Sequence, residues 1–301
     1  MIQPAAFHRP RLLIVGCGDV GMRLLPLVAA RFRVFALTSQ RERCRALRAA
    51  GAVPVVADLD DPASLRRLHG LADWVLHLAP PQPEGVLDRR TRHLVAALGR
   101  VARLAYVSTS GVYGDCGGAL VRESRPVAPR NARARRRVDA ERVLRAWALA
   151  NGTRLSILRV PGIYAGDRLP LKRLEQGTPA LRPEDDVYTN HIHADDLARI
   201  VLLSLLRGLP GRVVHAVDDT RMKMGDYFDA VADAFALARP PRLPRTELEA
   251  VVTPTLLSFM SESRRLDNTR LKRELRARLR FPDVATALAG VQSRPQEEKP
   301  A

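Results

Sequence analysis

The feature that most constrains this chain is a glycine-rich turn between an apolar run and a helical pattern. Leu12-Leu13-Ile14-Val15 leads directly into Gly16-Cys17-Gly18-Asp19-Val20-Gly21, and apolar residues then recur at helical spacing over 20–30. A strand, a GxGxxG turn and a helix in this order are typical of a domain that binds the pyrophosphate of a dinucleotide. The alternative is a glycine-rich strand–helix turn with no ligand.

Each glycine has a separate expected task. Gly16 permits the tight turn, Gly18 lets the backbone approach a pyrophosphate, and Gly21 lets the helix pack closely. The start of the helix then offers free N–H groups and a partial positive charge to the phosphates. We therefore predict that the cofactor contacts the whole turn: Gly16, Cys17, Gly18, Asp19, Val20 and Gly21.

Strand and helix patterns alternate over the first 160 residues. The expected strands are continuously apolar, as buried parallel strands require, and they lie at 12–15, 34–37, 53–56, 74–78, 104–108 and 155–158. Helical patterns lie between most of them, at 20–30, 86–98 and 138–150 among others, and Gly152 ends the last of these. The pattern predicts an α/β fold, a doubly wound parallel Rossmann sheet with helices on both faces.

The pattern changes after Pro161, where loops carry more proline and the helices are less regular. We expect helices at 194–206, 224–236 and 269–278, and one strand at 213–217 that returns to the sheet. This organisation predicts a nucleotide-binding domain over 1–168 and a small C-terminal substrate lobe over 169–292. Residues 293–301 have no apolar periodicity, and we expect a disordered tail there.

The end of the second strand bears on the choice of cofactor. An NAD site places a carboxylate there to accept from the ribose 2′-OH. This chain has Thr38 and Ser39, followed by Arg41 and Arg43, and its first acid, Glu42, falls inside the next helix. Hydroxyl and guanidinium groups suit a 2′-phosphate, so NADP(H) is expected rather than NAD(H). The alternative is that both arginines belong to a solvated helix face.

The next two strand ends complete the predicted cofactor site. Asp58 and Leu59 follow the third strand, where a carboxylate could accept from the adenine amino group and a leucine could cover its face. Asp61, which precedes Pro62, fits the cap of the following helix better than Asp58 does. The fourth strand ends in Leu78-Ala79-Pro80, where the small Ala79 lets the chain pass close to the cofactor.

In sequence order, further motifs make the chain resemble the extended short-chain dehydrogenase/reductase superfamily. These are His77-Leu78-Ala79, 106–114 (YVSTSGVYG), 123–126 (ESRP), 159–164 (RVPGIY) and 190–197 (NHIHADDL). The resemblance covers about 12–288, and the run at 265–272 is most similar to the atypical YeeZ-type branch of NAD(P)-dependent epimerases and dehydratases. It implies a Rossmann fold and hydride transfer on a small polar, sugar-nucleotide-like substrate.

The resemblance implies that Thr109 hydrogen-bonds the reacting oxygen, and that a Tyr–x3–Lys pair supplies acid and base. The corresponding positions here are Arg133 and Arg137, and no tyrosine of the chain has a lysine four residues on. A guanidinium stays protonated and cannot act as a general base near neutral pH. Arg137 could still contact the ribose or a phosphate.

Three consequences of the missing pair stay open. Another group could carry the proton, with Tyr113, Asp115, Glu123 and His193 as candidates; the reaction could need no tyrosine base; or the protein could bind nucleotide without catalysis, as a sensor or scaffold. We take Thr109 and Tyr113, beside a strand's carboxyl end, as the residues that face the substrate. His191 and His193 are interpreted as structural, with Asp195 or Asp196 capping the next helix, and no metal is expected.

Composition narrows the remaining classes. The 301-residue chain is 46% hydrophobic, which excludes disorder as a class, and its formal net charge is +17. The excess is almost all arginine, scattered and without interleaved aromatics, so we expect no nucleic-acid partner. The longest apolar run, 200–206, is too short to span a bilayer, and three unpaired cysteines fit a reducing cytoplasm. A small molecule is the expected partner, and a homodimer stays open.

Overall fold

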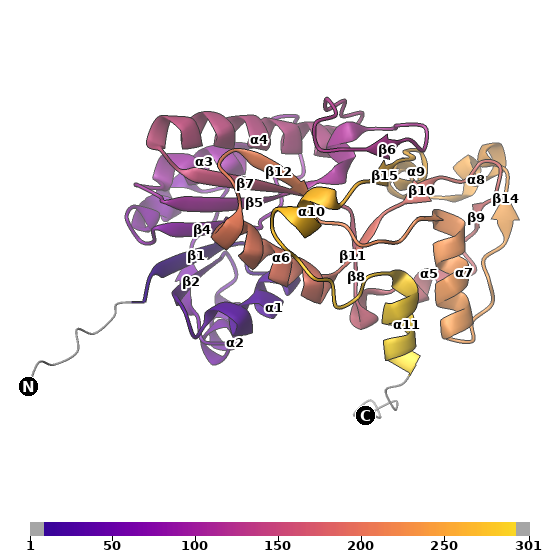
Figure 1. Cartoon of the computed structure of the whole chain (residues 1–301), viewed down its shortest axis with the longest axis horizontal. Coiled ribbons are helices and arrows are strands. Elements are labelled where there is room, and N and C mark those ends of the chain that lie inside the picture. The colour runs from indigo at the N-terminus through magenta and orange to yellow at the C-terminus, as the bar shows by residue number, and fades with distance from the viewer. Residues whose placement is uncertain (1–8, 293–301) are drawn as a thin grey trace, which may run out of the picture.

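The computed structural model describes residues 9–292. Its centre is a parallel seven-stranded sheet in the order β12-β7-β5-β4-β1-β2-β3 (Figure 1). The strands are β1 (Arg11–Val15), β2 (Arg33–Thr38), β3 (Val53–Val56), β4 (Trp74–His77), β5 (Arg103–Thr109), β7 (Arg154–Val160) and β12 (Arg212–His215). The predicted doubly wound Rossmann sheet is confirmed, including the late strand that returns to its edge beside β7.

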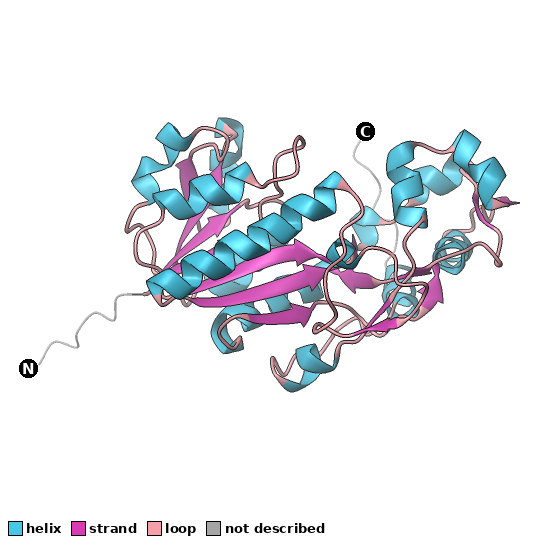
Figure 2. Ribbon diagram, turned by 90° about the horizontal axis from the view of Figure 1, so that it is seen from above, coloured by secondary structure: helices cyan, strands magenta, loops and turns pink. Residues whose placement is uncertain are grey.

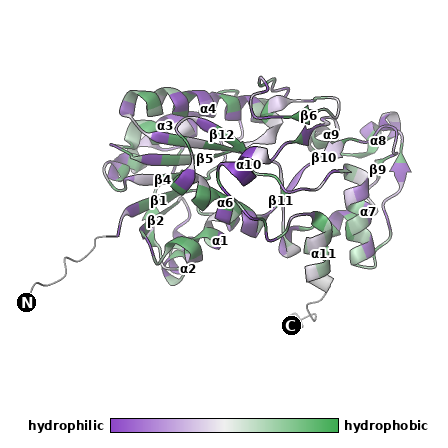
Figure 3. Cartoon of the chain, in the orientation of Figure 1, coloured by the Kyte–Doolittle hydropathy of each residue, from purple (hydrophilic) through white to green (hydrophobic). Residues whose placement is uncertain are grey.

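Helices cover both faces because successive residues of each buried strand point to opposite sides. Leu12 and Ile14 of β1 join one apolar cluster with α1 (Asp19–Val28) and α6 (Ala194–Arg207). Leu13 and Val15 join a second cluster with α3 (Arg89–Ala97) and α4 (Ala132–Asn151). Figure 2 shows α4 lying along the strands, and Figure 3 shows its mixed polar and apolar surface, with Ala140, Leu144 and Ala148 buried toward the sheet.

The helix boundaries differ from the sequence pattern in ways that capping explains. α3 begins only at Arg89, because the Asp88 carboxylate accepts from the Thr91 backbone N–H. α4 begins at Ala132 rather than 138, because Asn131 Oδ1 accepts from the Ala134 N–H at 2.9 Å. It ends as predicted at Gly152, which adopts the left-handed conformation. The helix expected over 269–278 stops at Arg273, and Arg276 has a φ of 51°.

The remaining short elements lie beyond the carboxyl ends of the strands and form the C-terminal lobe. They are α5 (Leu171–Glu175), α7 (Met224–Ala234), α8 (Arg245–Val251), α9 (Pro254–Met260), α11 (Val284–Gln292) and two-stranded pairs. The pairs are β8 (Gly162–Tyr164) with β11 (His191–His193), β9 (Ala180–Leu181) with β14 (Arg242–Leu243), β10 (Tyr188–Thr189) with β13 (Met222–Lys223), and β6 (Leu120–Val121) with β15 (Arg265–Leu266).

These short pairs were not expected, because a strand of two or three residues has no detectable periodicity. The remaining helices, α2 (Cys44–Ala49) and α10 (Thr269–Arg273), flank the sheet, while the 3₁₀ turns include 41–43 and 62–68. The boundary at residue 168 stays a prediction, and the expected tail at 293–301 lies outside the described residues. No helix within residues 9–292 is long and apolar enough to cross a membrane.

Candidate functional site

The glycine turn has the geometry that close approach of a ligand requires. Gly16 has a φ of +85°, and a Cβ there would lie 2.5 Å from the Ala79 backbone nitrogen. A side chain at this position would strain the backbone and collide with the end of β4. A Cβ at Gly18, in contrast, would meet no atom within 4 Å. The turn therefore leaves open space directly above the Gly18 backbone, where the pyrophosphate was predicted to lie.

The start of α1 faces this space without a side-chain cap from the described residues. The Asp19 carboxylate is turned away, toward Arg23 and Arg168, each at 2.9 Å. A Cβ at Gly21 would lie 3.0 Å from Cys17 Sγ, so close packing of the helix is confirmed, although its partner is the turn rather than the strand. Burial raises the pKa of the Cys17 thiol to about 11, which leaves it protonated and unreactive at neutral pH.

A cavity of about 320 Å³ extends from the turn across the ends of three neighbouring strands. It gathers ten of the residues predicted to hold the cofactor: Gly16, Cys17, Gly18, Thr38, Ser39, Asp58, Leu59, Leu78, Ala79 and Pro80. Asp19, Val20, Gly21, Arg41 and Arg137 are not part of its lining. Gln40, Arg43 and Arg90 join the lining. Of these, only Arg43 had been considered from the sequence.

At the edge of the cavity predicted to face the ribose, only one of the two candidate arginines contributes to the wall. The 3₁₀ turn over 41–43 leaves Arg41 exposed and outside the cavity, while Arg43 lies half-buried in its wall. Within residues 9–292 no carboxylate pairs with Arg43. The Thr38 hydroxyl bonds to the backbone of Gln40, so it holds the turn. Arg43 rather than Arg41 therefore borders the cavity, and a contact between either arginine and a 2′-phosphate stays a prediction.

The edge of the cavity predicted to face the adenine is built from the residues that follow β3. The Asp58 carboxylate is exposed and accepts from the Asp60 N–H at 2.9 Å, while Leu59 is buried beside it. Asp61 caps the following turn, as predicted, by accepting from the Ala63 N–H. Arg90 also lines this cavity, where it is paired with Asp60 and donates to the Pro80 carbonyl oxygen at 3.3 Å.

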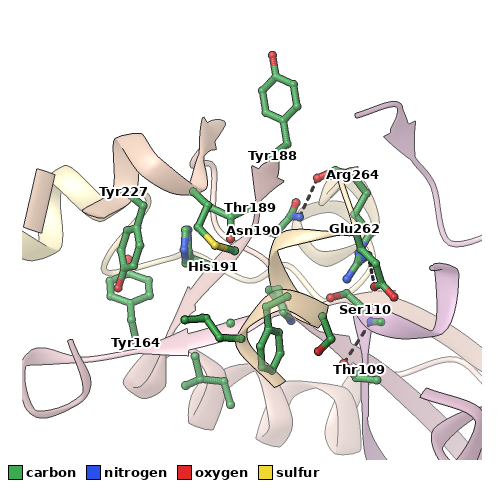
Figure 4. Close-up of a pocket in the computed structure, with 18 of the residues that line it drawn as sticks. Thr109, Ser110, Tyr164, Tyr188, Thr189, Asn190, His191, Tyr227, Glu262 and Arg264 are labelled. Carbon is green, nitrogen blue, oxygen red and sulfur yellow. Dashed lines mark hydrogen bonds and ion pairs between the residues drawn. The ribbon is translucent and has the colours of Figure 1, made fainter. Parts of the chain in front are cut away.

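A second cavity, of about 440 Å³, lies where the sheet meets the C-terminal lobe (Figure 4). Thr109 and Ser110 line it from the end of β5, and Tyr164, His191 and Tyr227 line it from the lobe. The Thr109 Oγ1 accepts from the Gly111 N–H at 3.2 Å. That bond leaves the hydroxyl hydrogen of Thr109 free to donate into the cavity, in keeping with its predicted role.

The two arginines at the acid/base positions differ in their surroundings. Arg133 lines the second cavity, with its guanidinium 4.4 Å from the centre of the Phe259 ring. Arg137 lines neither cavity; its Nη1 donates to the Val107 carbonyl oxygen at 2.9 Å and to Tyr106 Oη at 3.0 Å. The structure therefore holds Arg137 against the ends of the strands, and a contact between Arg137 and the ribose remains a prediction.

Tyr113 does not line the second cavity, which corrects the expectation that it faces a substrate there. It is 1% exposed, and Arg159 Nη1 donates to its hydroxyl oxygen at 2.7 Å. His215 Nδ1 lies 2.9 Å from the carbonyl oxygen of Asp267, so Nδ1 carries the hydrogen and Nε2 accepts from the Tyr113 hydroxyl at 2.6 Å.

The arginine of this network is itself paired inside the protein. Arg159 also donates to the buried Glu141 carboxylate at 2.8 Å, and Ser108 donates to the same carboxylate at 2.7 Å. Burial lowers the pKa of His215 to about 4, so the histidine is neutral, and Tyr113 is a structural member of a buried polar network.

The other proton-carrying candidates are also bound elsewhere. Asp115 accepts from the Ser263 N–H at 2.8 Å, and Glu123 accepts from the His215 N–H at 3.1 Å. His193 caps α6 by accepting from the Asp195 N–H at 3.2 Å, so the expected cap by Asp195 or Asp196 is wrong. Asp196 instead accepts from the Arg280 and Phe281 N–H groups, which ties the C-terminal segment to α6.

His191 is the titratable residue that sequence reasoning missed. It is 5% exposed, lines the second cavity, and stacks on Tyr227 with ring centres 4.2 Å apart. Burial lowers its pKa to about 4, and its Nδ1 has no hydrogen-bond partner among the described residues. Its spacing from His193 had been interpreted as structural. Within residues 9–292, no group of three or more His, Cys, Asp or Glu side chains is arranged to hold a metal ion.

Together, the sheet and the glycine-turn cavity define a Rossmann-type nucleotide-binding protein. The model of the NAD(P)H-binding family matches residues 16–207, more than half of the chain. The chain therefore belongs to the NAD(P)H-binding family, within the extended short-chain dehydrogenase/reductase superfamily.

Individual relatives agree with this assignment. The chain is 28% identical over 232 residues to a dTDP-4-dehydrorhamnose reductase from Mycobacterium tuberculosis, covering 69% of this chain and 70% of that one. It is similar to a conserved protein of unknown function from Silicibacter pomeroyi, with a TM-score of 0.77, 28% identity and coverage of 94% and 98%.

A dTDP-glucose 4,6-dehydratase from Streptomyces venezuelae, solved with NAD and TYD bound, has the same fold. Its TM-score is 0.74, its identity 22%, and the match covers 94% of this chain and 95% of that one.

Proposed function

We propose that this protein is an NADP(H)-dependent oxidoreductase or epimerase/dehydratase-like enzyme that acts on a small polar, sugar-nucleotide-like substrate. The observation that carries the proposal is the open space above Gly18, bordered by an uncapped helix start and by Arg43. The reductase and dehydratase relatives, whose names refer to dTDP-sugars, support this substrate class. A cytoplasmic location and a homodimer remain expectations.

The residues of the first cavity fit the parts of an NADP(H) molecule. The Gly16–Gly18 backbone would hold the pyrophosphate, Ser39 and Arg43 the 2′-phosphate, and Asp58 and Leu59 the adenine. No carboxylate stands at the end of β2 to accept from a free ribose 2′-OH, since Glu42 lies in the 3₁₀ turn beyond it, and the Arg43 guanidinium has no acidic partner in the described chain. Both observations favour NADP(H) over NAD(H).

When bound, the nicotinamide cofactor supplies or accepts a hydride. The chain contributes orientation: Thr109 would donate its hydroxyl hydrogen to the substrate oxygen, and the Ser110 hydroxyl lies in the same wall. Arg133 could stabilise negative charge on that oxygen but could not remove a proton. His191 lines the same cavity, and its neutral ring has an Nδ1 without a partner in the described chain, so it could accept a hydrogen bond from the substrate. Its lowered pKa makes it a weak base, so a role for it in proton transfer is part of the proposal.

A non-catalytic NADP(H) sensor or scaffold is the second candidate function. It is favoured by the arginines at both acid/base positions and by the burial of Tyr113 inside its polar network. General acid/base catalysis contributes roughly 10²–10⁴-fold in rate, so its loss would leave binding intact while slowing alcohol–ketone chemistry.

One experiment separates the two candidates. The purified protein is titrated with NADPH and NADH by calorimetry, then incubated with a panel of dTDP- and UDP-sugars while the absorbance of the reduced nicotinamide and the products are followed. Tighter NADPH binding with substrate-dependent turnover supports the enzyme. NADPH binding without a redox change or a new product across the panel supports the sensor, and absence of binding to either dinucleotide overturns both.

A further inference from the structure

Arg173, in α5, places a positive charge in the second cavity without an acidic partner. Its Nη2 donates to the Pro179 carbonyl oxygen at 2.7 Å, and its guanidinium lies 4.1 Å from the centre of the Phe228 ring. Its Nε is buried with no acceptor, and no carboxylate lies within 4.0 Å of the guanidinium among residues 9–292. Of the five N–H donors of this side chain, the described protein therefore satisfies one.

This arrangement is unfavourable for the protein alone. A charge removed from water costs free energy unless it is paired or hydrogen-bonded, and stacking on an aromatic ring compensates only in part. Burial accordingly lowers the pKa of Arg173 to about 10, with no neighbouring anion to oppose the shift. The guanidinium remains charged at neutral pH and has no counter-ion in the described protein.

The rest of the cavity wall has the same charge bias. Its charged lining residues are four arginines and a single glutamate: Arg133, Arg168, Arg173, Arg264 and Glu262. Arg168 is paired with Asp19, and Arg264 is paired with Glu262 at 2.8 Å. No carboxylate lies within 4.0 Å of Arg133 among the described residues, and Glu262, which is already paired with Arg264, acts on Arg133 only at longer range. Arg173 has no acidic neighbour even at that range.

We propose that the second cavity binds a small acid, whose carboxylate or phosphate group is held by Arg173 with Arg133 as the second cation. The inference rests on the proposed function only in taking this cavity as the substrate site. The acidic group would accept hydrogen bonds from Arg173 while its charge offsets both cations. The remaining polar side chains, including Thr109 and His191, would then face the uncharged part of the same molecule.

The test measures anion binding with defined probes: inorganic phosphate, pyrophosphate, succinate and, as an uncharged comparison, glucose. Thermal unfolding and calorimetry are run on the wild type, on Arg173→Met and on Arg239→Met. Methionine keeps an apolar, polarisable group on Phe228. Arg239 is a matched control on the same lobe, because it is exposed, paired with Asp233 and outside the cavity.

We expect phosphate or succinate to raise the melting temperature of the wild type, with glucose inert. Arg173→Met should weaken that binding about tenfold, since a hydrogen bond between charged groups is lost. Its melting temperature without an anion should be unchanged or higher, whereas a structural role would lower it. Arg173→Lys should recover part of the affinity, and Arg239→Met should match the wild type.

Because phosphate also suits the glycine turn, each titration is repeated in a Gly18→Val background, whose side chain fills the first cavity. A phosphate-only response identifies a phosphate ester, and a succinate response identifies a carboxylate. Equal anion affinity in the wild type and Arg173→Met overturns the inference, as does a wild type that no probe stabilises. An anion response in a protein that binds neither dinucleotide overturns the proposed function and leaves this inference standing.

Discussion

The two cavities of this protein are built from different parts of the chain. The first is lined by short runs at the carboxyl ends of four adjacent strands, 16–18, 37–40, 57–59 and 78–80, together with Arg43 and Arg90. The second combines the end of β5 with segments of the C-terminal lobe as far away as Arg264. The first therefore follows from the order of the strands, whereas the second depends on how the lobe packs against the sheet, and they should respond differently to substitution.

The difference also appears in the charges. In the first cavity Arg90 is paired with Asp60, and Arg43 is the cation without a carboxylate partner in the described chain. In the second, Arg133 and Arg173 both lack one. Arginines without a carboxylate within 4.0 Å thus lie in the walls of both cavities. The two proposed anion contacts, a 2′-phosphate at Arg43 and an acidic group at Arg173, can be tested with separate variants.

The largest effect is expected on NADPH affinity, from a substitution in the glycine turn. Gly18→Val should weaken NADPH binding about 100-fold, because its side chain occupies the space of the pyrophosphate. The melting temperature should stay near that of the wild type, since a Cβ at Gly18 meets nothing within 4 Å. Gly16→Ala is the comparison: with a φ of +85° and a clash at Ala79, it should lose stability as well. Unchanged NADPH affinity in Gly18→Val would show that the pyrophosphate does not lie above Gly18.

A smaller effect is expected from Tyr113, which belongs to neither cavity. Tyr113→Phe should lower the free energy of unfolding by about 1–3 kcal/mol, because Arg159 and His215 lose a buried partner. NADPH affinity and any turnover per folded molecule should be retained. Urea unfolding and calorimetry on the same samples measure both. If Tyr113→Phe has normal stability but has lost turnover, the structural role is wrong and Tyr113 takes part in the reaction.

The preference for NADPH over NADH tests whether Arg43, rather than Arg41, contacts the 2′-phosphate. Arg43→Met should reduce the preference for NADPH over NADH about tenfold, because one charge-assisted bond to the 2′-phosphate is lost. Arg41→Met, two residues away and outside the cavity, should change that preference by less than about twofold. Dissociation constants for both dinucleotides decide the question. Equal effects of the two substitutions would indicate that the general positive charge of this surface, rather than a specific contact with Arg43, determines the preference for NADPH.

The smallest effect concerns His191. Its folded-state pKa, about 4, lies below the ordinary value of 6.5, so the unfolded chain binds the proton more readily. Above about pH 6.5 the histidine is neutral in both states and the free energy of unfolding is at its full value. As the pH falls toward 4, protonation of His191 in the unfolded chain lowers that free energy. His77 and His215 contribute with the same sign. Asp218, whose pKa burial raises to about 7, contributes with the opposite sign.

Because these contributions overlap, the wild-type slope alone is not diagnostic. His191→Phe, which keeps the stack on Tyr227, should remove on the order of 1 kcal/mol of the acid-induced loss between about pH 7 and pH 5. Urea midpoints of both proteins at the two pH values provide the measurement. The same acid-induced loss in variant and wild type would mean that His191 is already protonated or solvated in the folded protein.

Prediction from sequence succeeded where chemistry follows directly from local order. Gly16, Gly18, Thr38, Asp58 and Ala79 come together because the carboxyl ends of adjacent parallel strands share one edge of the sheet. It could not tell Arg41 from Arg43, because only the 3₁₀ turn over 41–43 places Arg43, and not Arg41, in the cavity wall. A two-residue shift of that kind has no periodic signature.

Apolar periodicity and the spacing of three glycines were enough to fix the sheet, the phosphate turn and the residues that follow each strand. Both are local properties, set by backbone sterics and by the burial of consecutive positions. Only the tertiary structure placed Tyr113 inside a polar network and brought His191 and Arg173 into one cavity. The hydrogen-bond partners of a side chain, its solvent exposure and the presence of a counter-ion depend on segments distant in sequence. They are therefore properties of the folded chain rather than of any motif.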